Sequence, residues 1–192
     1  MEELKRRIAV LDDAMRPFRS RQEMTVPNLE LAALQLRKCY ELVGFASISA
    51  NRQRYGRIRK RFEKDWKLSE ILNRIEALNP QFLPQGVRLL EGDGSAGHPH
   101  GIESKELEFK KADLLRYHGM LGPLMHAANP YGKQIDYLKW HKWLCSRRDE
   151  LVDLLSNHVA NIEFQRTFYL CSMRVLPNDE VSVSIFNITD MS

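Results

Sequence analysis

Residues 26–55 read VPNLELAALQLRKCYELVGFASISANRQRY, and this stretch decides the fold. Apolar residues recur at three- and four-residue steps along two faces of the helix that it predicts. The first set is Leu29, Ala32, Leu36, Tyr40 and Val43, and the second is Leu31, Leu34, Leu42, Phe45 and Ile48. A helix that is apolar on two faces needs partners on both, so we expect the central helix of a helical domain. Gly44 costs about 1 kcal/mol relative to alanine in a helix, which predicts a close contact with another helix there.

Further helices and one hairpin are expected around this central helix. Apolar spacing predicts helices at about 2–19, 68–78, 105–119 and 133–158. Residues 79–103 hold five of the ten glycines and three of the eight prolines, so we interpret them as a long irregular connection, with 87–90 compatible with a short strand. β-branched and aromatic residues at 167–175 and 180–188 predict a hairpin.

The expected fold class is therefore mainly α, a helical bundle of about five helices with a C-terminal β-hairpin. The length of 192 residues favours a single domain over 1–192, with 160–192 as a hairpin appendage. A hairpin alone is marginally stable in water, so it must pack on the helices or pair with another chain.

Composition predicts a cytoplasmic protein that does not contact a membrane. The chain is 43% hydrophobic and 28% charged, as soluble globular proteins are. Its first residues, MEELKRRIAVLDD, do not resemble a signal peptide, and no apolar run approaches the ~20 residues of a membrane span. Cys39, Cys145 and Cys171 are far apart and odd in number, which favours buried, reduced thiols.

Positive charge is concentrated just after the central helix. Residues 52–67 carry eight Lys or Arg and two acids, a local charge of +6, while the rest of the chain has 21 basic and 23 acidic residues, or −2. The candidate nucleic-acid-binding residues are Arg52, Arg54, Arg57, Arg59, Lys60, Arg61 and Lys64. Such residues neutralise phosphates, and the interleaved Tyr55, Phe62 and Trp66 can stack on unpaired bases. The alternative is a solvated helix face with its aromatic residues turned inward.

Residues 115–130, LRYHGMLGPLMHAANP, are a second candidate site. They combine two histidines and Arg116 with a helix break, and histidine can serve as a general acid or base while arginine binds a phosphate. Alternatively, His126 braces the end of a helix. Arg37 and Glu41, one helical turn apart, form a structural ion pair or line a polar pocket beside His126.

Other chemistry is poorly represented. His98 and His100 with Asp93 could hold a metal, but solvent exposure is the better interpretation for a glycine-rich loop, and we expect neither metal nor cofactor. The sequence has no Walker A motif, dinucleotide fingerprint, HExxH or CxxC pair, which argues against the enzyme classes that those motifs define.

Several short segments carry a resemblance to a known family. They are 29–38 (LELAALQLRK), 45–47 (FAS), 50–51 (AN), 121–122 (LG) and 126–130 (HAANP). In local sequence and in the order of the helices, residues 26–158 resemble a set of bacterial helical proteins that in turn resemble the HEPN superfamily. That resemblance implies a small helical bundle, often dimeric, of the kind common in toxin–antitoxin and antiphage defence systems, where many members cut RNA.

The family's ribonuclease motif is an arginine and a histidine separated by four to six residues, and no histidine of this chain has an arginine at that spacing. By resemblance, His126 corresponds to the motif histidine, and the arginine would come from Arg116, ten residues earlier, or from Arg37. The resemblance therefore implies an RNA-binding protein that is a candidate metal-free ribonuclease and a homodimer.

A different class of function is also consistent with these residues. In that alternative the chain is a non-catalytic interaction module, whose basic run meets an acidic protein partner. The hairpin, or a surface formed by Trp140 and Trp143, would then make the dimer.

Overall fold

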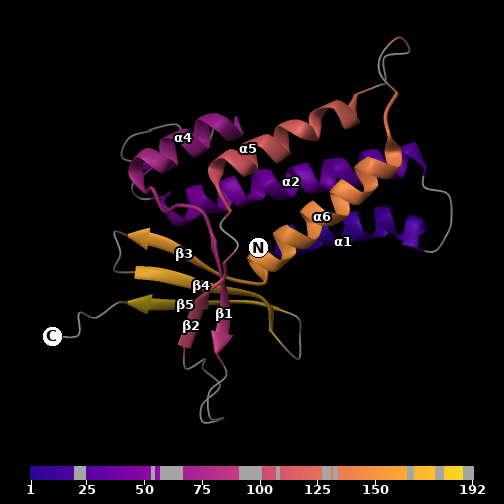
Figure 1. Ribbon diagram of the computed structural model, residues 1–192. Coiled ribbons are helices and arrows are strands. Elements are labelled where there is room, and N and C mark those ends of the chain that lie inside the picture. The colour runs from indigo at the N-terminus through magenta and orange to yellow at the C-terminus, as the bar shows by residue number, and fades with distance from the viewer. Residues whose placement is uncertain are drawn as a thin grey trace. The chain divides into compact units, whose positions relative to one another are not determined.

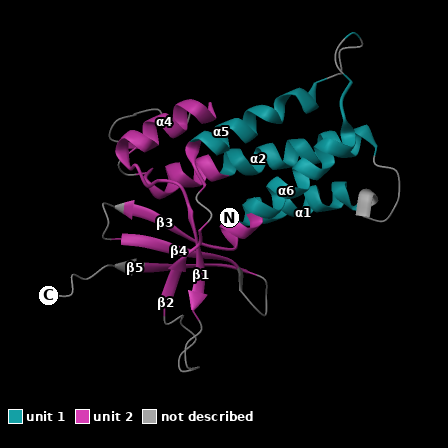
Figure 2. Cartoon of the chain, in the orientation of Figure 1, with its two compact units in different colours: residues 1–42, 112–151 teal, residues 43–111, 152–192 magenta. Residues whose placement is uncertain are grey.

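The structure is a computed structural model that describes residues 1–19, 25–52, 55–56, 67–90, 101–106, 109–126, 131, 134–163, 167–175 and 180–187. The chain forms two compact units, each built from two separate segments (Figure 2). Unit 1 contains Met1–Leu42 and Ala112–Leu151, and unit 2 contains Val43–Lys111 and Val152–Ser192. The single-domain expectation stays a prediction.

Unit 1 is helical (Figure 1). Its elements are α1 (Glu2–Arg19), the first part of α2 (Val26–Ala50), α5 (Lys111–Met120), the short 3₁₀ helix η2 (Gly122–Met125) and most of α6 (Tyr137–Ser156). The first apolar set of α2 is buried as predicted, with Leu29, Ala32, Leu36 and Tyr40 at most 1% exposed. Buried leucines of α1, α5 and α6 complete an apolar interior, so hydrophobic burial holds these helices together.

The second apolar set of α2 behaves differently from our expectation. Leu31, Leu34 and Phe45 remain 38–39% exposed, whereas Ile48 is buried. The prediction that α2 is enclosed on both faces is therefore wrong along part of its length. α2 also ends at Ala50 rather than near residue 55.

Unit 2 contains α4 (Leu68–Leu78) and a five-stranded antiparallel sheet (Figure 1). The strands are β1 (Gln85–Leu90), β2 (Gly101–Ser104), β3 (Asn157–Glu163), β4 (Thr167–Val175) and β5 (Glu180–Asn187). Their order across the sheet is β2-β1-β3-β4-β5, so β3 lies at the centre. The predicted hairpin is present as β4 and β5, which pair from Thr167 opposite Asn187 to Val175 opposite Glu180.

The fold is α+β, and our expectation of a mainly α helical bundle with one hairpin was wrong. The predicted helix at 133–158 ends at Ser156, and the chain continues directly into the central strand β3. The stretch 79–103, interpreted as irregular, contributes all of β1 and part of β2. β3 was missed because its asparagines weaken the apolar alternation of a strand, and its pairing with both β1 and β4 supplies what local pattern lacks.

Gly44 makes the close contact that its position predicted. A Cβ atom built there would lie 2.5 Å from Leu68 Cδ1 and 3.6 Å from Leu72 Cδ2, both on α4. A separation below 3 Å forces atoms to move, so a larger residue would require the Leu68 side chain to shift. Glycine therefore allows α4 to pack tightly against the last part of α2.

A set of hydrogen-bonded amides, here called the amide network, joins the residues that directly follow α2 and α4 to β3 within unit 2. It comprises Asn51, Asn79, Gln81 and Asn161. Asn79 Nδ2 donates to Asn51 Oδ1 at 3.2 Å and to the backbone carbonyl of Asn161 at 2.9 Å. Asn79 Oδ1 accepts a hydrogen bond from the backbone N–H of Gln81 at 3.1 Å. Asn51 and Asn79 are only 2% and 7% exposed, so these bonds satisfy polar groups that water does not reach.

The three cysteines are free thiols, and Cys39 and Cys171 are buried. Burial raises the pKa of the Cys39 thiol to about 12, which keeps it protonated and unreactive near neutral pH. Across the described segments of the chain, no helix combines the length and apolar character needed to cross a membrane.

Candidate acid–base site

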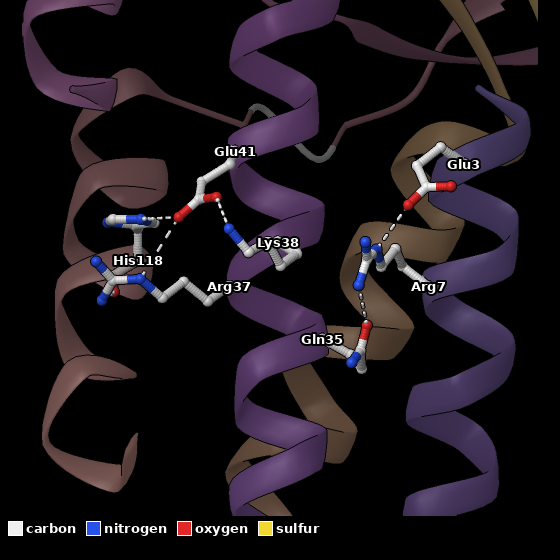
Figure 3. Close-up of polar contacts among 7 residues, drawn as sticks. All are labelled: Glu3, Arg7, Gln35, Arg37, Lys38, Glu41 and His118. Atoms are coloured by element: carbon white, nitrogen blue, oxygen red, sulfur yellow. Dashed lines mark hydrogen bonds and ion pairs between the residues drawn. The ribbon is translucent and has the colours of Figure 1, made fainter. Parts of the chain in front are cut away.

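One side of α2 in unit 1 presents three charged residues within a single turn. Arg37 and Lys38 precede Glu41 by four and three positions, and such pairs are neighbours on a helix surface. Helix α5 adds His118, whose ring faces the Glu41 carboxylate (Figure 3). We call these four residues the Glu41 cluster.

The Glu41 carboxylate is the centre of this cluster. Its Oε1 lies 3.1 Å from His118 Nε2 and 3.6 Å from Arg37 Nε, and its Oε2 accepts a hydrogen bond from Lys38 Nζ at 2.9 Å. Both carboxylate oxygens are therefore engaged by cationic or hydrogen-bonding groups. The predicted ion pair between Arg37 and Glu41 is confirmed.

The cluster is partly buried but reaches solvent. The side chains of His118, Glu41, Arg37 and Lys38 are 17%, 21%, 27% and 46% exposed. Burial raises the pKa of Glu41, but hydrogen bonds from Lys38 and His118 outweigh it, so the net pKa lies below the ordinary value. Glu41 is consequently ionised at neutral pH.

His118 is held neutral by its surroundings. Burial lowers its pKa, the hydrogen bond with Glu41 opposes that shift, and the charge of Arg37 adds to it, leaving a net pKa below the usual value. An ionised carboxylate only accepts hydrogen bonds, so Nε2 of the neutral ring must carry the proton that it donates to Glu41. Nδ1 then has the free lone pair, and no described group bonds to it. This ring is suited to accept a proton.

Arg37 is positioned by the break that follows α5. Its Nη1 donates to the His118 carbonyl at 3.3 Å, and a Cβ atom on Gly122 would lie 3.4 Å from the same nitrogen. The start of η2 therefore lies within van der Waals distance of the guanidinium. One arginine thereby contacts both the backbone of the histidine and its carboxylate partner.

Polar residues on another side of α2 have a structural role. Arg7 of α1 donates to Glu3 Oε1 at 2.8 Å and to Gln35 Oε1 at 3.0 Å (Figure 3). Gln35 is only 5% exposed, so Arg7 satisfies its buried oxygen. This bridge joins α1 to α2.

The predicted catalytic residues are not brought together. Arg37 lies in the Glu41 cluster, whereas Arg116 bonds to Asp113 Oδ1 at 2.7 Å and to the Tyr117 hydroxyl at 3.1 Å. Positions 116 and 118 of α5 project about 200° apart, so the arginine and His118 diverge. His126 is exposed at the end of η2, and among the described contacts it makes none with Arg37 or Arg116.

His118 is the residue that sequence reasoning passed over. It lay in the quoted segment 115–130, but the family resemblance favoured His126. A usable signal was present in the helical spacing, because His118 precedes Gly122 by one turn and the buried Tyr117 fixes which face of α5 points inward. The pairing with α2 itself came only from the tertiary structure.

Most of the predicted basic patch lies outside the described residues. Arg52 is described and exposed, while Arg54, Arg57, Arg59, Lys60, Arg61 and Lys64 lie outside the described residues. Lys67, at the end of the basic run, pairs with Glu70 at 3.1 Å.

The candidate metal ligands Asp93, His98 and His100 also lie outside the described residues. Within the part of the chain that is described, no three His, Cys, Asp or Glu side chains gather in a way that could hold a metal ion.

Comparisons with known proteins give no relative. No family model matches the chain, and neither the curated proteins nor the solved structures contain a match. The HEPN resemblance accordingly remains a prediction, and the function has to be argued from the geometry of this chain alone.

Proposed function

We propose that this protein binds RNA and cleaves its phosphodiester backbone without a metal ion, with His118 as the general base. The observation that carries the proposal is the 3.1 Å contact between His118 Nε2 and Glu41 Oε1, beside Arg37. A base oriented by a second group and accompanied by a cation is the arrangement that acid–base catalysis requires.

Each residue has a distinct role in this mechanism. Glu41 holds the His118 ring in the tautomer that leaves Nδ1 unprotonated, and Arg37 supplies positive charge for the phosphate. With His118 neutral, the two cations and one carboxylate leave a net charge of +1, which favours an anionic substrate.

The bond changes are those of RNA transesterification. His118 removes the proton of a ribose 2′-hydroxyl, the 2′-oxygen attacks the adjacent phosphorus, and the bond from phosphorus to the 5′-oxygen breaks. The departing 5′-oxygen takes a proton from solvent, to which the imidazolium later releases its own. The products are a 2′,3′-cyclic phosphate and a 5′-hydroxyl end, and a 2′-deoxy substitution at the cleaved position prevents the reaction.

The test is cleavage of a labelled single-stranded RNA in the presence of a chelator. We expect His118→Gln and Arg37→Gln each to lower the rate by about 10²-fold or more, as loss of an acid–base or charge-stabilising group does. Arg6→Gln is the matched control, because it also removes an arginine that pairs with a glutamate one helical turn away, in this case Glu3. The Arg6 side chain is 74% exposed and lies outside the Glu41 cluster. Thermal unfolding of each variant separates loss of chemistry from loss of fold.

His126→Gln and Arg116→Gln distinguish this site from the one that the sequence predicted. If the Glu41 cluster is the active site, both variants keep their activity, because neither residue contacts the cluster among the described interactions. Cleavage that survives His118→Gln but disappears in His126→Gln would overturn the assignment. Absence of any RNA binding or cleavage by the wild-type chain would remove the proposed function itself.

A further inference from the structure

Among the described strands, the sheet of unit 2 has two edges that differ in kind. β2 is four residues long and carries the exposed acid Glu103. β5 is eight residues long, and the described residues pair it with β4 alone. A further strand can pair with the outer side of an edge strand through backbone N–H and C=O groups, so β5, as the longer described edge, offers the longer template.

The side chains of β5 do little to protect this edge. Natural proteins shield edge strands with lysines, prolines or inward-pointing charges. The sequence EVSVSIFN has none of these beyond Glu180 at its first position. Val183 and Ile185 are instead 53% and 63% exposed, which is high for β-branched apolar side chains.

The exposed side chains continue an apolar face of the sheet. Val183 is directly opposite Cys171 of β4, and Ile185 is opposite Tyr169. Opposed residues of an antiparallel pair project to the same face, so Val183 and Ile185 extend the face on which Cys171 is buried. That face ends at β5 among the described strands, and a further strand beside β5 would extend it.

We propose that β5 pairs with β5 of a second copy of this chain, in antiparallel orientation, to form a homodimer with a continuous sheet. A two-fold axis perpendicular to two identical strands makes them antiparallel, so the symmetry of a dimer and the geometry of a ladder agree. With the axis at Ser184, Val183 lies opposite Ile185 of the partner subunit, and the same pair forms again across the axis.

This register gathers four β-branched side chains on one face. Two Val–Ile pairs meet across the new junction, and apolar cross-strand pairs of this kind stabilise a sheet. Ser184 faces its own copy on the opposite side of the sheet, where two hydroxyls can hydrogen-bond. A second copy therefore fits β5 through side chains as well as backbone.

Charge also favours a second copy in this orientation. Glu180, the acid at the start of β5, is four residues from Ser184, so the two copies of Glu180 lie at opposite ends of the ladder. The centre of the pairing is uncharged. A parallel arrangement would bring the two carboxylates together, which is unfavourable.

One strand pair is small beside the roughly 1,600 Å² of a standard stable interface, so we expect a dimer that dissociates on dilution. Sedimentation velocity over a wide concentration range tests this with three proteins: wild type, Ile185→Lys and Glu103→Lys. The lysine at β2 is the matched control, since it adds the same side chain to the opposite edge of the same sheet.

We expect wild type and Glu103→Lys to associate with similar constants and Ile185→Lys to associate at least tenfold more weakly. Both substituted side chains are exposed, so circular dichroism should show an unchanged fold. A wild type that stays monomeric at every concentration, or equal weakening by both lysines, overturns the proposal.

Cross-linking tests the register. Opposed Cα atoms of antiparallel strands lie about 4.5–5.5 Å apart, within the roughly 4.4–6.8 Å range of a disulfide. Under mild oxidation Ser184→Cys should give a covalent dimer, Glu103→Cys should not, and adding Ile185→Lys to Ser184→Cys should suppress it. Equal cross-linking at both edges contradicts the register. No RNA is involved, so these outcomes are independent of the proposed ribonuclease activity.

Discussion

The Glu41 cluster of unit 1 and the amide network of unit 2 both satisfy the hydrogen-bonding groups of polar side chains within the fold, but with different chemical groups. Both bond polar side chains that lie on α2 or directly after it, but the first uses charged groups and the second uses neutral amides. Asn51 and Asn79 of the network are buried, at 2% and 7% exposed, whereas the Glu41 side chain keeps 21% of its surface exposed. Neutral amides can be buried cheaply once they are bonded, while charges need partners and some solvent.

This difference separates a structural role from a chemical one. An amide does not gain or lose a proton between pH 4 and 9, so the network can only hold α2, α4 and β3 together. The histidine and the carboxylate of the Glu41 cluster can change protonation and sit where solvent reaches them. Four predictions test this contrast, beginning with the largest effect.

Loss of the amide network should be the most damaging. Asn79→Ala removes three hydrogen bonds and leaves the buried side-chain oxygen of Asn51 without this donor, so we expect the free energy of unfolding to fall by about 3 kcal/mol. Urea denaturation measures it, and the loss should be the same at pH 5 and pH 8. Asn73→Ala, at an exposed position of α4, should change stability by less than about 0.5 kcal/mol. A loss that depends strongly on pH would break the contrast.

A charged contact within unit 1 should have a smaller, salt-dependent effect. Arg148 of α6 donates two hydrogen bonds to Asp12 of α1, one of 2.9 Å to Oδ1 and one of 2.6 Å to Oδ2. This contact raises the pKa of the arginine. We expect Asp12→Ala to cost about 2 kcal/mol, with the loss reduced in high salt.

The next residue supplies the control for that measurement. Asp13 pairs with Arg16, and their side chains are 66% and 72% exposed, so Asp13→Ala should cost under about 0.5 kcal/mol. Both substitutions introduce the same residue at neighbouring positions of α1, which cancels helix propensity. Equal losses would mean that the Asp12 contact contributes no more than a surface pair.

The Glu41 cluster should show the smallest effect on stability and the clearest dependence on pH. The lowered pKa of His118 means that the unfolded chain binds a proton more readily than the folded one, so stability falls as pH drops through 6.5. The lowered pKa of Glu41 adds a further loss as pH drops below about 4.5. Neither effect is present at higher pH, where His118 is neutral and Glu41 is ionised in both states.

Glu41→Gln isolates the interaction between these two groups. The carboxylate raises the pKa of His118 against the effect of burial, so its replacement by a neutral amide should lower that pKa further. Nuclear magnetic resonance titration of the His118 ring measures the shift, and the acid limb of the cleavage rate should move in the same direction. Glu30→Gln, at an exposed position of the same helix, is the control. An unchanged or higher midpoint in Glu41→Gln would refute the coupling.

Local patterns anticipated much of the helical part of this protein. Apolar spacing predicted α1 at about 2–19 and α4 at 68–78, close to the bounds that the structure has, and Gly44 predicted a close helix contact, which the structure shows to be with α4. The same reasoning joined Arg37 to Glu41, since residues four apart on a helix must be neighbours. These successes share a cause, because each depends on residues close together in the sequence.

Contacts between distant segments were beyond such reasoning. The central strand β3 pairs with β1, some 70 residues earlier, and its own sequence carries only a weak alternation. Likewise, His118 and Glu41 are in contact although 77 positions separate them in the sequence. The sequence of neither helix alone indicates which histidine lies beside Glu41.

The amino-acid sequence by itself determined the helical segments, the terminal hairpin, the concentration of positive charge after α2 and the Arg37–Glu41 pair, because periodicity and helix geometry act over a few residues. Only the tertiary structure decided that the hairpin belongs to a five-stranded sheet, and that His118 is the histidine beside Glu41. Strand pairing and helix contacts bring together groups that the chain separates, and their stability comes from the partner segment rather than from local preference.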